Sequence, residues 1–447
     1  MNNSNQWSSK LGFILASAGA AIGLGAIWKM PYETGENGGG AFFLMYVILT
    51  LLIGLPMLLS EYIIGRNTQK EAITAYKVLA PGKPIWTWIG KIGVIGCFLL
   101  LSFYSVVGGW IFVYSGTSIV GNVIDPAITP GDYFNKVIGT PWIALIGLGL
   151  FTLANVVVIA LGVQNGIEKA NKFMMPLLFI MFIILVVRAL TLDGAMEGVR
   201  FFLSPDFSQI TAQSFLYALG QSFFALAVGF SCLVTYSSYL KKDVSLPSSA
   251  GSVVMLTLFV SLLAGLAIFP VVFSFGMDPA SGPGLLFMVL PAAFGQMPFG
   301  EVFLALFLLL FLFATLTSSF SLYEIIVAAI LEKFKVPRVT VSIILGIIVF
   351  IAAVPALLSY SSLSDVSIFG RSIFDATDFL VSNVMLPLGN FLIAIFIIYV
   401  MKKEMVKSEL LMGSSMNGSY YSVYRFLMTF IVPVVILVVL VYSILMW

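Results

Sequence analysis

The sequence contains no histidine, two cysteines and few charged residues, and each scarcity excludes a class of protein. Without imidazole, the chain offers no histidine metal ligand and no histidine for acid–base or triad catalysis. Cys97 and Cys232 both lie inside apolar stretches, which argues against a disulfide framework or a thiolate cluster. Only 9% of the 447 residues are charged, against about 25% in soluble proteins, and 60% are hydrophobic. This composition excludes a water-soluble fold and indicates an integral membrane protein.

The few charges are nearly balanced, with 22 lysines and arginines against 20 aspartates and glutamates. A net charge of +2 gives no reason to expect a nucleic-acid partner. The expected surroundings are the lipid bilayer, and the sequence indicates no oligomeric state.

Eleven apolar segments are long enough to cross a membrane, because a helix needs about 20 residues to span a hydrocarbon layer ~30 Å thick. They cover residues 11–28, 37–60, 92–124, 137–167, 173–187, 207–240, 244–277, 302–323, 339–364, 379–401 and 426–447. The short segment 173–187 is expected to begin in the amphipathic stretch near Glu168. The charge-free run 279–300 contains four prolines and is predicted to be a structured loop.

The distribution of basic residues predicts the orientation, because cytoplasmic loops carry an excess of lysine and arginine. A cytoplasmic N-terminus leaves outside only Lys29, Lys136, Arg188, Arg200 and Arg371. An odd number of spans then places the C-terminus on the extracellular side.

Two of the predicted spans contain helix-breaking or polar residues near the middle of the membrane. The first reads SAGAAIGLGAIWKMP, with Gly19, Gly23 and Gly25. The sixth reads QSFFALAVGFSCLVTYSSY, with Gln221, Gly229 and Ser231. Glycine-rich stretches also permit close helix packing, which is the simpler interpretation of either segment alone.

The two unusual spans occupy corresponding places in two blocks of five spans. Residues 1–190 are predicted to form the first repeat and residues 205–403 the second, and residues 404–447 add a cytoplasmic loop and the eleventh span. Interrupted spans at matching positions of inverted repeats indicate a transporter site. Bared peptide groups cost several kcal/mol each in hydrocarbon, so such breaks indicate that something polar binds there.

The eighth span is rich in hydroxyl side chains, at Thr315, Thr317, Ser318, Ser319 and Ser321. A single serine or threonine in a membrane helix usually bonds to its own backbone. Five such residues within seven positions are more than this tendency explains. Thr317 and Ser318 beside freed carbonyls would form a cage of oxygen atoms. Because the cage has no carboxylate, it suits sodium rather than a divalent ion.

The chain closely resembles the neurotransmitter:sodium symporter family, in its bacterial amino-acid transporter branch. The resemblance covers essentially all eleven spans and rests on LGFILASAGAAIGLGAIWKMPYETGENGGGAFFLMY, EYIIGR, FFALAVGFSCLVTYSSY and ATLTSS. It implies an all-α fold of eleven transmembrane helices in a 5+5 inverted repeat like that of the leucine transporter. It also implies that helices 1 and 6 are unwound in mid-membrane, and that the protein lies in the bacterial cytoplasmic membrane.

The resemblance further implies one well-formed sodium site. Its ligands would be the carbonyls of Gly19, Ile22 and Ala314 and the hydroxyls of Thr317 and Ser318.

The family's second sodium site would fall on Ala21, Ala225 and Thr257, with Ala26 where an asparagine usually stands. Losing these side-chain oxygens raises the cost of stripping water from sodium, so we expect one tightly bound ion. The family's chloride position keeps Tyr46, Gln221 and Ser261 but loses a hydroxyl at Ala225, so chloride dependence is not expected.

The substrate site implied by the resemblance is largely apolar. Its residues would be Ala20, Ala21, Leu24, Gly25, Leu100, Tyr104, Phe224, Ala225, Ala227, Phe230, Ser318 and Leu322. The backbone N–H groups of Leu24 and Gly25 and the hydroxyl of Tyr104 would bind a carboxylate. The ammonium group would meet the carbonyls of Ala21, Phe224 and Ala225. Gly23 stands where monoamine carriers have an aspartate, which favours a substrate with its own carboxylate.

Gates are expected at both ends of this site. Lys29 and Asp378 match the family's outer pair, and Trp7 and Glu332 match inner gate positions. Tyr104 and Phe230 would form an aromatic lid over the substrate.

The predicted function is sodium-coupled symport of neutral hydrophobic L-amino acids into the cell by alternating access. An ion channel and a proton-coupled amino-acid carrier are the alternatives. An enzyme is not expected, because the site lacks histidine and paired carboxylates.

Overall fold

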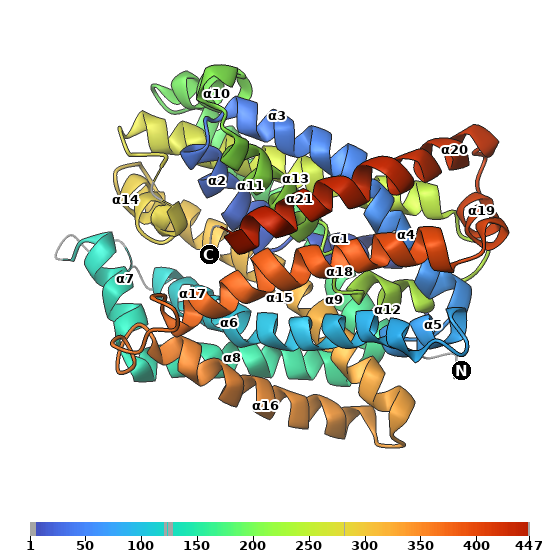
Figure 1. The fold of residues 1–447 in the computed structure, drawn as a ribbon. Helices are drawn as coiled ribbons and strands as arrows, with labels where there is room; N and C mark the ends of the chain where they lie inside the picture. Colours follow the sequence, from blue (N-terminus) through green and yellow to red (C-terminus); the bar gives the residue numbers. More distant parts are fainter. Residues whose placement is uncertain (1–5, 120–122, 124–127, 281, 446–447) are drawn as a thin grey trace.

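The computed structural model describes residues 6–119, 123, 128–280 and 282–445. These residues form helices and two isolated β-bridges, and no β-strand occurs among them. Most of the long helices run side by side (Figure 1). The helices α5 and α20 lie at one end of the bundle, and α21 runs from there towards the other end.

The helices of the first half follow the predicted apolar segments closely. They are α1 (Lys10–Ala21), α2 (Met30–Glu36), α3 (Gly40–Leu49), α4 (Leu55–Thr68), α5 (Ala72–Leu79), α6 (Thr87–Ile119), α7 (Pro130–Gly139), α8 (Pro141–Ala160), α9 (Lys169–Leu190) and α10 (Ala195–Leu203). Turns of π-helix at Gly25–Lys29, Thr50–Gly54 and Val163–Glu168 lead directly into α2, α4 and α9.

The second half also consists of long helices joined by shorter ones. Its helices are α11 (Ala212–Ala225), α12 (Cys232–Ser238), α13 (Leu246–Ser274), α14 (Val289–Gly295), α15 (Gly300–Lys333), α16 (Arg338–Leu358), α17 (Ile373–Phe379), α18 (Leu386–Ile395), α19 (Lys403–Leu411), α20 (Gly418–Phe426) and α21 (Val432–Leu445). Part of the predicted loop 279–300 is the short helix α14.

Nine helices of the described chain are long and apolar enough to cross a membrane, and ten if the bent pair Lys10–Ala21 and Gly25–Glu36 is one span. The predicted span 207–240 is divided between α11 and α12, each shorter than a membrane crossing. The eleven-span count therefore stays a prediction. The last residues of the predicted spans 92–124 and 426–447 lie outside the described residues.

The surface of the bundle is apolar where a soluble protein would be polar. On α16, Ile343, Ile347 and Ile351 recur every four residues and are 46%, 56% and 63% exposed. Residues at this spacing share one helix face, so α16 presents a hydrophobic stripe outwards. Such a face is typical of contact with lipid.

The helix α15 lies in the middle of the molecule and positions the site. It packs against α6, α8 and α9 and also contacts both interrupted segments, α1 and α12. The interrupted segments each start with a side-chain cap: Ser9 Oγ accepts from the Gly12 N–H at 3.0 Å, and Thr211 and Ser214 form a capping box. These caps satisfy N–H groups that a helix start leaves unpaired.

Candidate substrate and sodium site

The first interruption lies between α1 and the π-helical turn that begins at Gly25. Residues 22–24 separate the two helices, whose axes differ by 52°. Ile22 leaves the helical conformation with φ −86° and ψ 81°. A helix end bares its last carbonyl groups, so α1 presents peptide oxygens inside the protein.

Hydroxyl groups of α15 face this helix end. Ser318 Oγ donates to the Gly19 carbonyl at 2.8 Å, and Thr317 Oγ1 donates to the Ala314 carbonyl at 3.0 Å. Both side chains are buried. Four of the five residues predicted to bind sodium are thus joined in two pairs, and the fifth, Ile22, is the residue at which α1 ends.

The other hydroxyls of α15 make no hydrogen bond to α1 among the described residues. Thr315 donates to the Phe311 carbonyl at 2.7 Å and Ser321 to the Ser318 carbonyl at 2.8 Å, both within α15. Ser319 donates at 2.5 Å to Asn155 on α8. The abundance of hydroxyls on this helix is therefore partly local backbone bonding, and Ser318 is the one that crosses to α1.

The second interruption, between α11 and α12, has a strained backbone. Ala227, Gly229 and Ser231 all have positive φ, at 53°, 108° and 59°. The left-handed conformation costs a residue with a Cβ about 1–2 kcal/mol, so Ala227 and Ser231 keep it only because their surroundings impose it. Tyr76 OH and Ser231 Oγ are 2.8 Å apart, which holds one end of the segment.

A buried carboxylate, Glu61 on α4, binds the second interruption. Glu61 is fully buried and accepts from the N–H groups of Gly229 at 2.7 Å, Leu233 at 3.1 Å and Val234 at 3.3 Å. A negative charge is favoured at a helix N-terminus, here that of α12. The sequence reading assigned Glu61 no role, although a carboxylate within an apolar span signals a functional position.

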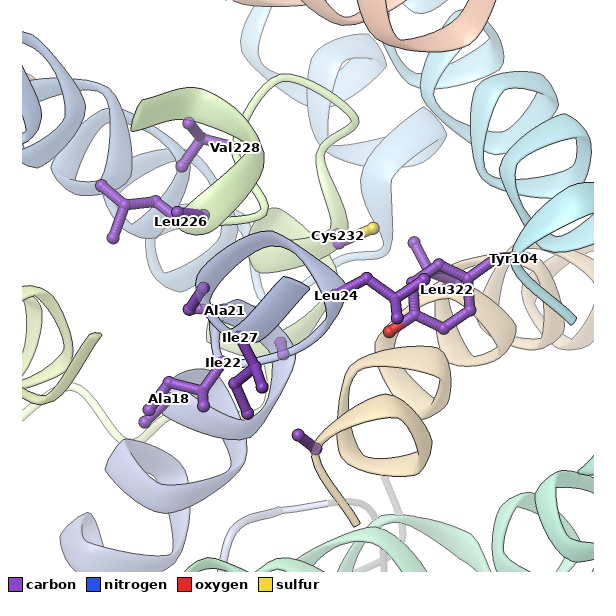
Figure 2. Close-up of a cluster of buried hydrophobic side chains, with 14 of the residues drawn as sticks. Ala18, Ala21, Ile22, Leu24, Ile27, Tyr104, Leu226, Val228, Cys232 and Leu322 are labelled. Atoms are coloured by element: carbon purple, nitrogen blue, oxygen red, sulfur yellow. The ribbon is translucent and has the colours of Figure 1, made fainter. Parts of the chain in front are cut away.

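A small central cavity of about 40 Å³ lies between the two interruptions and α6, α15 and α18. The residues that line it are Ala20, Ala21, Gly23, Leu24, Gly25, Leu100, Tyr104, Phe224, Ala227, Phe230, Cys232, Ser318, Ser321, Leu322 and Leu386. Figure 2 shows the Leu24 side chain directed towards Tyr104 and Leu322, whereas Leu226 and Val228 lie on the other side of the first interruption.

All the predicted substrate-site residues line this cavity except Ala225, the last residue of α11. The cavity adds Cys232, Ser321 and Leu386, which the sequence reading missed. Cys232 Sγ lies 3.2 Å from Cys97 Sγ on α6, and both thiols are free. The two apolar cysteines are thus neighbours, which their separation of 135 positions in the sequence does not indicate.

Glycine is required at two cavity positions because functional side chains approach the backbone there. A Cβ on Gly23 would overlap Ser318 Oγ and Tyr104 OH, and a Cβ on Gly25 would overlap the Phe224 ring. Tyr104 OH also donates to the Thr315 carbonyl at 3.2 Å. These glycines therefore bring site residues together, which goes beyond close packing of helix backbones.

Two larger cavities, of about 510 and 230 Å³, lie beyond the central one. Lys29 and Asp378 line both, but no ion pair joins them in the described part of the chain. Lys29 Nζ instead lies 5.2 Å from the centre of the Phe224 ring, and Asp378 accepts from Ser382 Oγ at 2.7 Å. The two residues predicted as the outer gate pair face the same space without closing it.

The side chain of Phe224 lies where the central cavity meets the outer ones. It lines all three cavities, whereas Tyr104 and Phe230, the predicted lid, line only the central cavity. Within the described structure Phe224 therefore borders all three cavities, whereas Tyr104 and Phe230 are walls of the central one. Leu24 and Leu386 each border the central cavity and one outer cavity.

The residues predicted for the inner gate belong to separate contacts. Trp7 is buried, and its Nε1 donates to the Tyr236 carbonyl of α12 at 2.8 Å. Glu332 pairs with Lys70 at 2.5 Å, and both side chains are about one-third exposed. The sequence did not indicate the ion pair between Glu324 and Arg338, which is largely buried.

The residues of the predicted second sodium site supply few side-chain oxygens to bind an ion. Ala21, Ala26 and Ala225 have no side-chain oxygen, and Thr257 Oγ1 donates to the Val253 carbonyl of its own helix at 2.9 Å. No group of three or more cysteine and acidic side chains that could hold a metal occurs among the described residues.

At the predicted chloride position, Tyr46 OH and Ser261 Oγ lie 3.2 Å apart, and Gln221 Nε2 donates to the Gly25 carbonyl at 2.6 Å. Gln221 is therefore bonded to the turn that follows the first interruption, and Tyr46 and Ser261 contact each other.

Comparison with known proteins decides the family. The sequence profile of the Sodium:neurotransmitter symporter family matches residues 4–124 and 137–447. The chain belongs to this family. The resemblance seen in the motifs is thereby confirmed, and the protein is a multi-pass membrane transporter of a sodium-dependent family rather than an enzyme.

Two relatives are similar over nearly the whole length of the chain, and a third is similar over part of it. An uncharacterized sodium-dependent transporter, YhdH of Bacillus subtilis, is 50% identical over 435 residues, covering 97% of this chain and 96% of that protein. The crystal structure of MhsT in complex with L-phenylalanine matches with a TM-score of 0.92 and 41% identity, covering 98% and 99% of the two chains. The bovine sodium-dependent neutral amino acid transporter B(0)AT2 is 30% identical over 59% of this chain and 40% of its own.

Proposed function

We propose that this protein carries neutral hydrophobic L-amino acids into the cell together with sodium, by alternating access. The observation that carries the proposal is the first interruption, where the Gly19 carbonyl accepts from Ser318 Oγ of α15 and Leu24 and Gly25 line the central cavity. Ion and substrate would therefore share residues 19–25. The complex of MhsT with L-phenylalanine and the name of the bovine relative support an amino-acid substrate.

Sodium would be held by the carbonyls of Gly19, Ile22 and Ala314 and the hydroxyls of Thr317 and Ser318. These are neutral, hard oxygen ligands, which suit a monovalent cation better than a divalent one. The contacts of Ser318 with Gly19 and of Thr317 with Ala314 support this assignment. Because the second predicted site is lined by alanines, we propose one sodium ion per substrate.

The substrate carboxylate would bind the N–H groups of Leu24 and Gly25, with the hydroxyl of Tyr104. The start of a helical segment favours negative charge, and Gly25 begins the π-helical turn. The ammonium group would meet carbonyls on the opposite side, at Ala21 and Phe224.

The substrate side chain would lie against Leu100, Phe230 and Leu322, which are apolar walls of the central cavity. A cavity of about 40 Å³ accommodates only a few water molecules, each needing about 10–15 Å³. Phe224 must therefore move for a hydrophobic amino acid to enter. A hydrocarbon pocket favours bulky aliphatic and aromatic side chains.

One sodium ion supplies enough energy for accumulation. A charge that crosses a potential of 100 mV gains about 2.3 kcal/mol, and a tenfold sodium gradient adds about 1.4 kcal/mol. Together these support roughly several-hundred-fold accumulation of a zwitterion.

The transport cycle requires a repeated architecture and a defined orientation. We propose the 5+5 inverted repeat over residues 1–190 and 205–403, with α11 and α12 as one unwound span. The orientation has the N-terminus in the cytoplasm and the C-terminus outside, in the bacterial cytoplasmic membrane.

Purified protein in liposomes tests the proposal. Labelled phenylalanine, leucine, alanine and glutamate are offered under inward gradients of sodium, potassium or protons. We expect uptake of the hydrophobic amino acids driven by sodium alone, and counterflow that saturates. Uptake driven by protons without sodium, or flux that does not saturate, would favour the carrier or channel alternatives. A coupling ratio of two sodium ions per substrate would overturn the single-site assignment.

A further inference from the structure

Asn171 on α9 has a buried polar atom that nothing in the described structure satisfies. Its side chain is fully buried, and Nδ2 donates to the Ile167 carbonyl at 2.9 Å. Its Oδ1 has no hydrogen-bond partner among the described residues. A buried amide oxygen without a partner is costly, so such an atom calls for an explanation.

The unpaired oxygen points at the predicted sodium ligands. A Cβ built on Gly19 would overlap Asn171 Oδ1 and would lie 3.1 Å from Thr317 Cβ. Asn171 Oδ1 therefore lies against the backbone of Gly19, on the side that faces Thr317. The bond from Nδ2 to Ile167 fixes the amide so that the oxygen, rather than the nitrogen, takes this position.

Asn155, a second buried asparagine on a helix that packs against α15, differs from Asn171 because its amide oxygen has a partner. Asn155 on α8 donates through Nδ2 to the Phe151 carbonyl at 2.9 Å, and its Oδ1 accepts from Ser319 Oγ at 2.5 Å. Every polar atom of that side chain has a partner within the protein. The hydroxyl of Thr317, which like Asn171 lies beside Gly19, donates instead to the Ala314 carbonyl.

We infer that Asn171 Oδ1 is a further oxygen ligand of the transported sodium ion and sets the affinity and selectivity of its site. The inference rests on the proposed function, since it concerns the same site. An amide oxygen is a hard, uncharged ligand, so it adds to the cage without favouring a divalent ion. The ion would then contact three elements, α1, α15 and α9, instead of two.

Sodium-dependent binding of labelled L-phenylalanine to the purified protein in detergent tests this inference. We expect Asn171→Ala to raise the half-saturating sodium concentration about tenfold, the effect of losing one good polar contact. Phenylalanine binding at saturating sodium should stay within about twofold of the unchanged protein. The ratio of half-saturating lithium to sodium should also change, which a purely structural role would not produce.

Two further variants sharpen the result. Asn155→Ala removes an equally buried asparagine from the other side of α15, and we expect lower thermal stability with an unchanged half-saturating sodium concentration. Asn171→Asp keeps an oxygen in place and adds a negative charge, so it should lower that concentration. It decides the question if the alanine variant does not fold.

An Asn171→Ala protein whose sodium half-saturation and lithium ratio match the unchanged protein would overturn the inference alone, as would a rise in half-saturating sodium for Asn171→Asp. Phenylalanine binding by the unchanged protein that ignores sodium would overturn the proposed function, and the inference with it.

Discussion

The two interrupted helices differ in what satisfies their bared peptide groups. The first breaks over residues 22–24, and its carbonyl side meets the hydroxyl of Ser318. The second breaks over residues 226–231, with three left-handed residues, and its N–H groups meet the carboxylate of Glu61. Both breaks adjoin the central cavity, but only the second has a negative charge of the protein bound to it among the described contacts.

This difference suggests different roles for the two breaks under the proposed function. A helix start that already binds an internal carboxylate has no need of a substrate carboxylate, so the second break is a fixed wall. Under the proposed function, the first break would bind the substrate carboxylate through its N–H groups and the sodium ion through its carbonyls. Four substitutions test this difference.

The largest effect is expected at the carboxylate of the second break. Glu61→Ala would leave the N–H groups of Gly229, Leu233 and Val234 buried without partners, at about 1–3 kcal/mol each. We expect a loss of several kcal/mol in the free energy of unfolding, measured by thermal unfolding in detergent. Glu332→Gln is the control, because its pair with Lys70, about one-third exposed, is worth under about 1 kcal/mol. A stable Glu61→Ala protein would show that the second break does not depend on this charge.

At the first break, Thr317→Ala should abolish the sodium dependence of phenylalanine binding. The change removes one of two hydroxyls from the predicted cage, and a sodium titration of binding measures the loss. Thr315→Ala serves as a matched control, because that hydroxyl bonds within α15 at 2.7 Å. Sodium dependence that survives in Thr317→Ala would move the ion away from this break.

The substrate side of the first break is tested by Gly23→Ala. The added methyl group would overlap Ser318 Oγ and Tyr104 OH, and overpacking costs about 1–3 kcal/mol. We expect phenylalanine affinity to fall roughly ten- to hundredfold in equilibrium binding. Gly251→Ala on α13 should leave affinity unchanged, because a Cβ there meets nothing within 4 Å. Equal affinities in the two variants would contradict the close approach at Gly23.

The smallest effect is expected at Ala227, a left-handed residue of the second break. Ala227→Gly relieves about 1–2 kcal/mol of backbone strain but gives up about 0.5–1 kcal/mol in chain entropy. We expect the unfolding temperature to stay the same or rise slightly. Ala218→Gly, in the interior of α11, should lower it, because glycine costs about 1 kcal/mol in a helix. A clear fall for Ala227→Gly would mean that its Cβ contacts outweigh the strain.

Much of this arrangement follows from the sequence, and the exceptions have physical causes. Hydropathy locates the long helices, because uninterrupted apolar runs of sufficient length have few other outcomes. Hydropathy predicts one continuous span at residues 207–240, but the structure has two helices there, α11 and α12, each too short to cross the membrane alone. The breaks at Gly23 and Gly229 were indicated by glycine and polar residues, and most of the predicted cavity lining lies together.

Contacts between distant parts of the chain were harder to foresee. The bond between Glu61 and Gly229 joins residues 168 positions apart, and only the packing of α4 on α12 creates it. Lys29 and Asp378 have opposite charges, but the sequence does not show that Lys29 lies over the Phe224 ring. The unpaired oxygen of Asn171 is visible only once every neighbouring donor has been placed.

The neighbouring thiols of Cys97 and Cys232 have a practical consequence. They are the two cysteines of the chain, and their sulfur atoms lie 3.2 Å apart where α6 meets α12. Both thiols are buried, so a thiol reagent would label them only when these helices separate. Replacing both cysteines with serine would give a protein without thiols. A label attached to a cysteine introduced elsewhere would then report on that position alone.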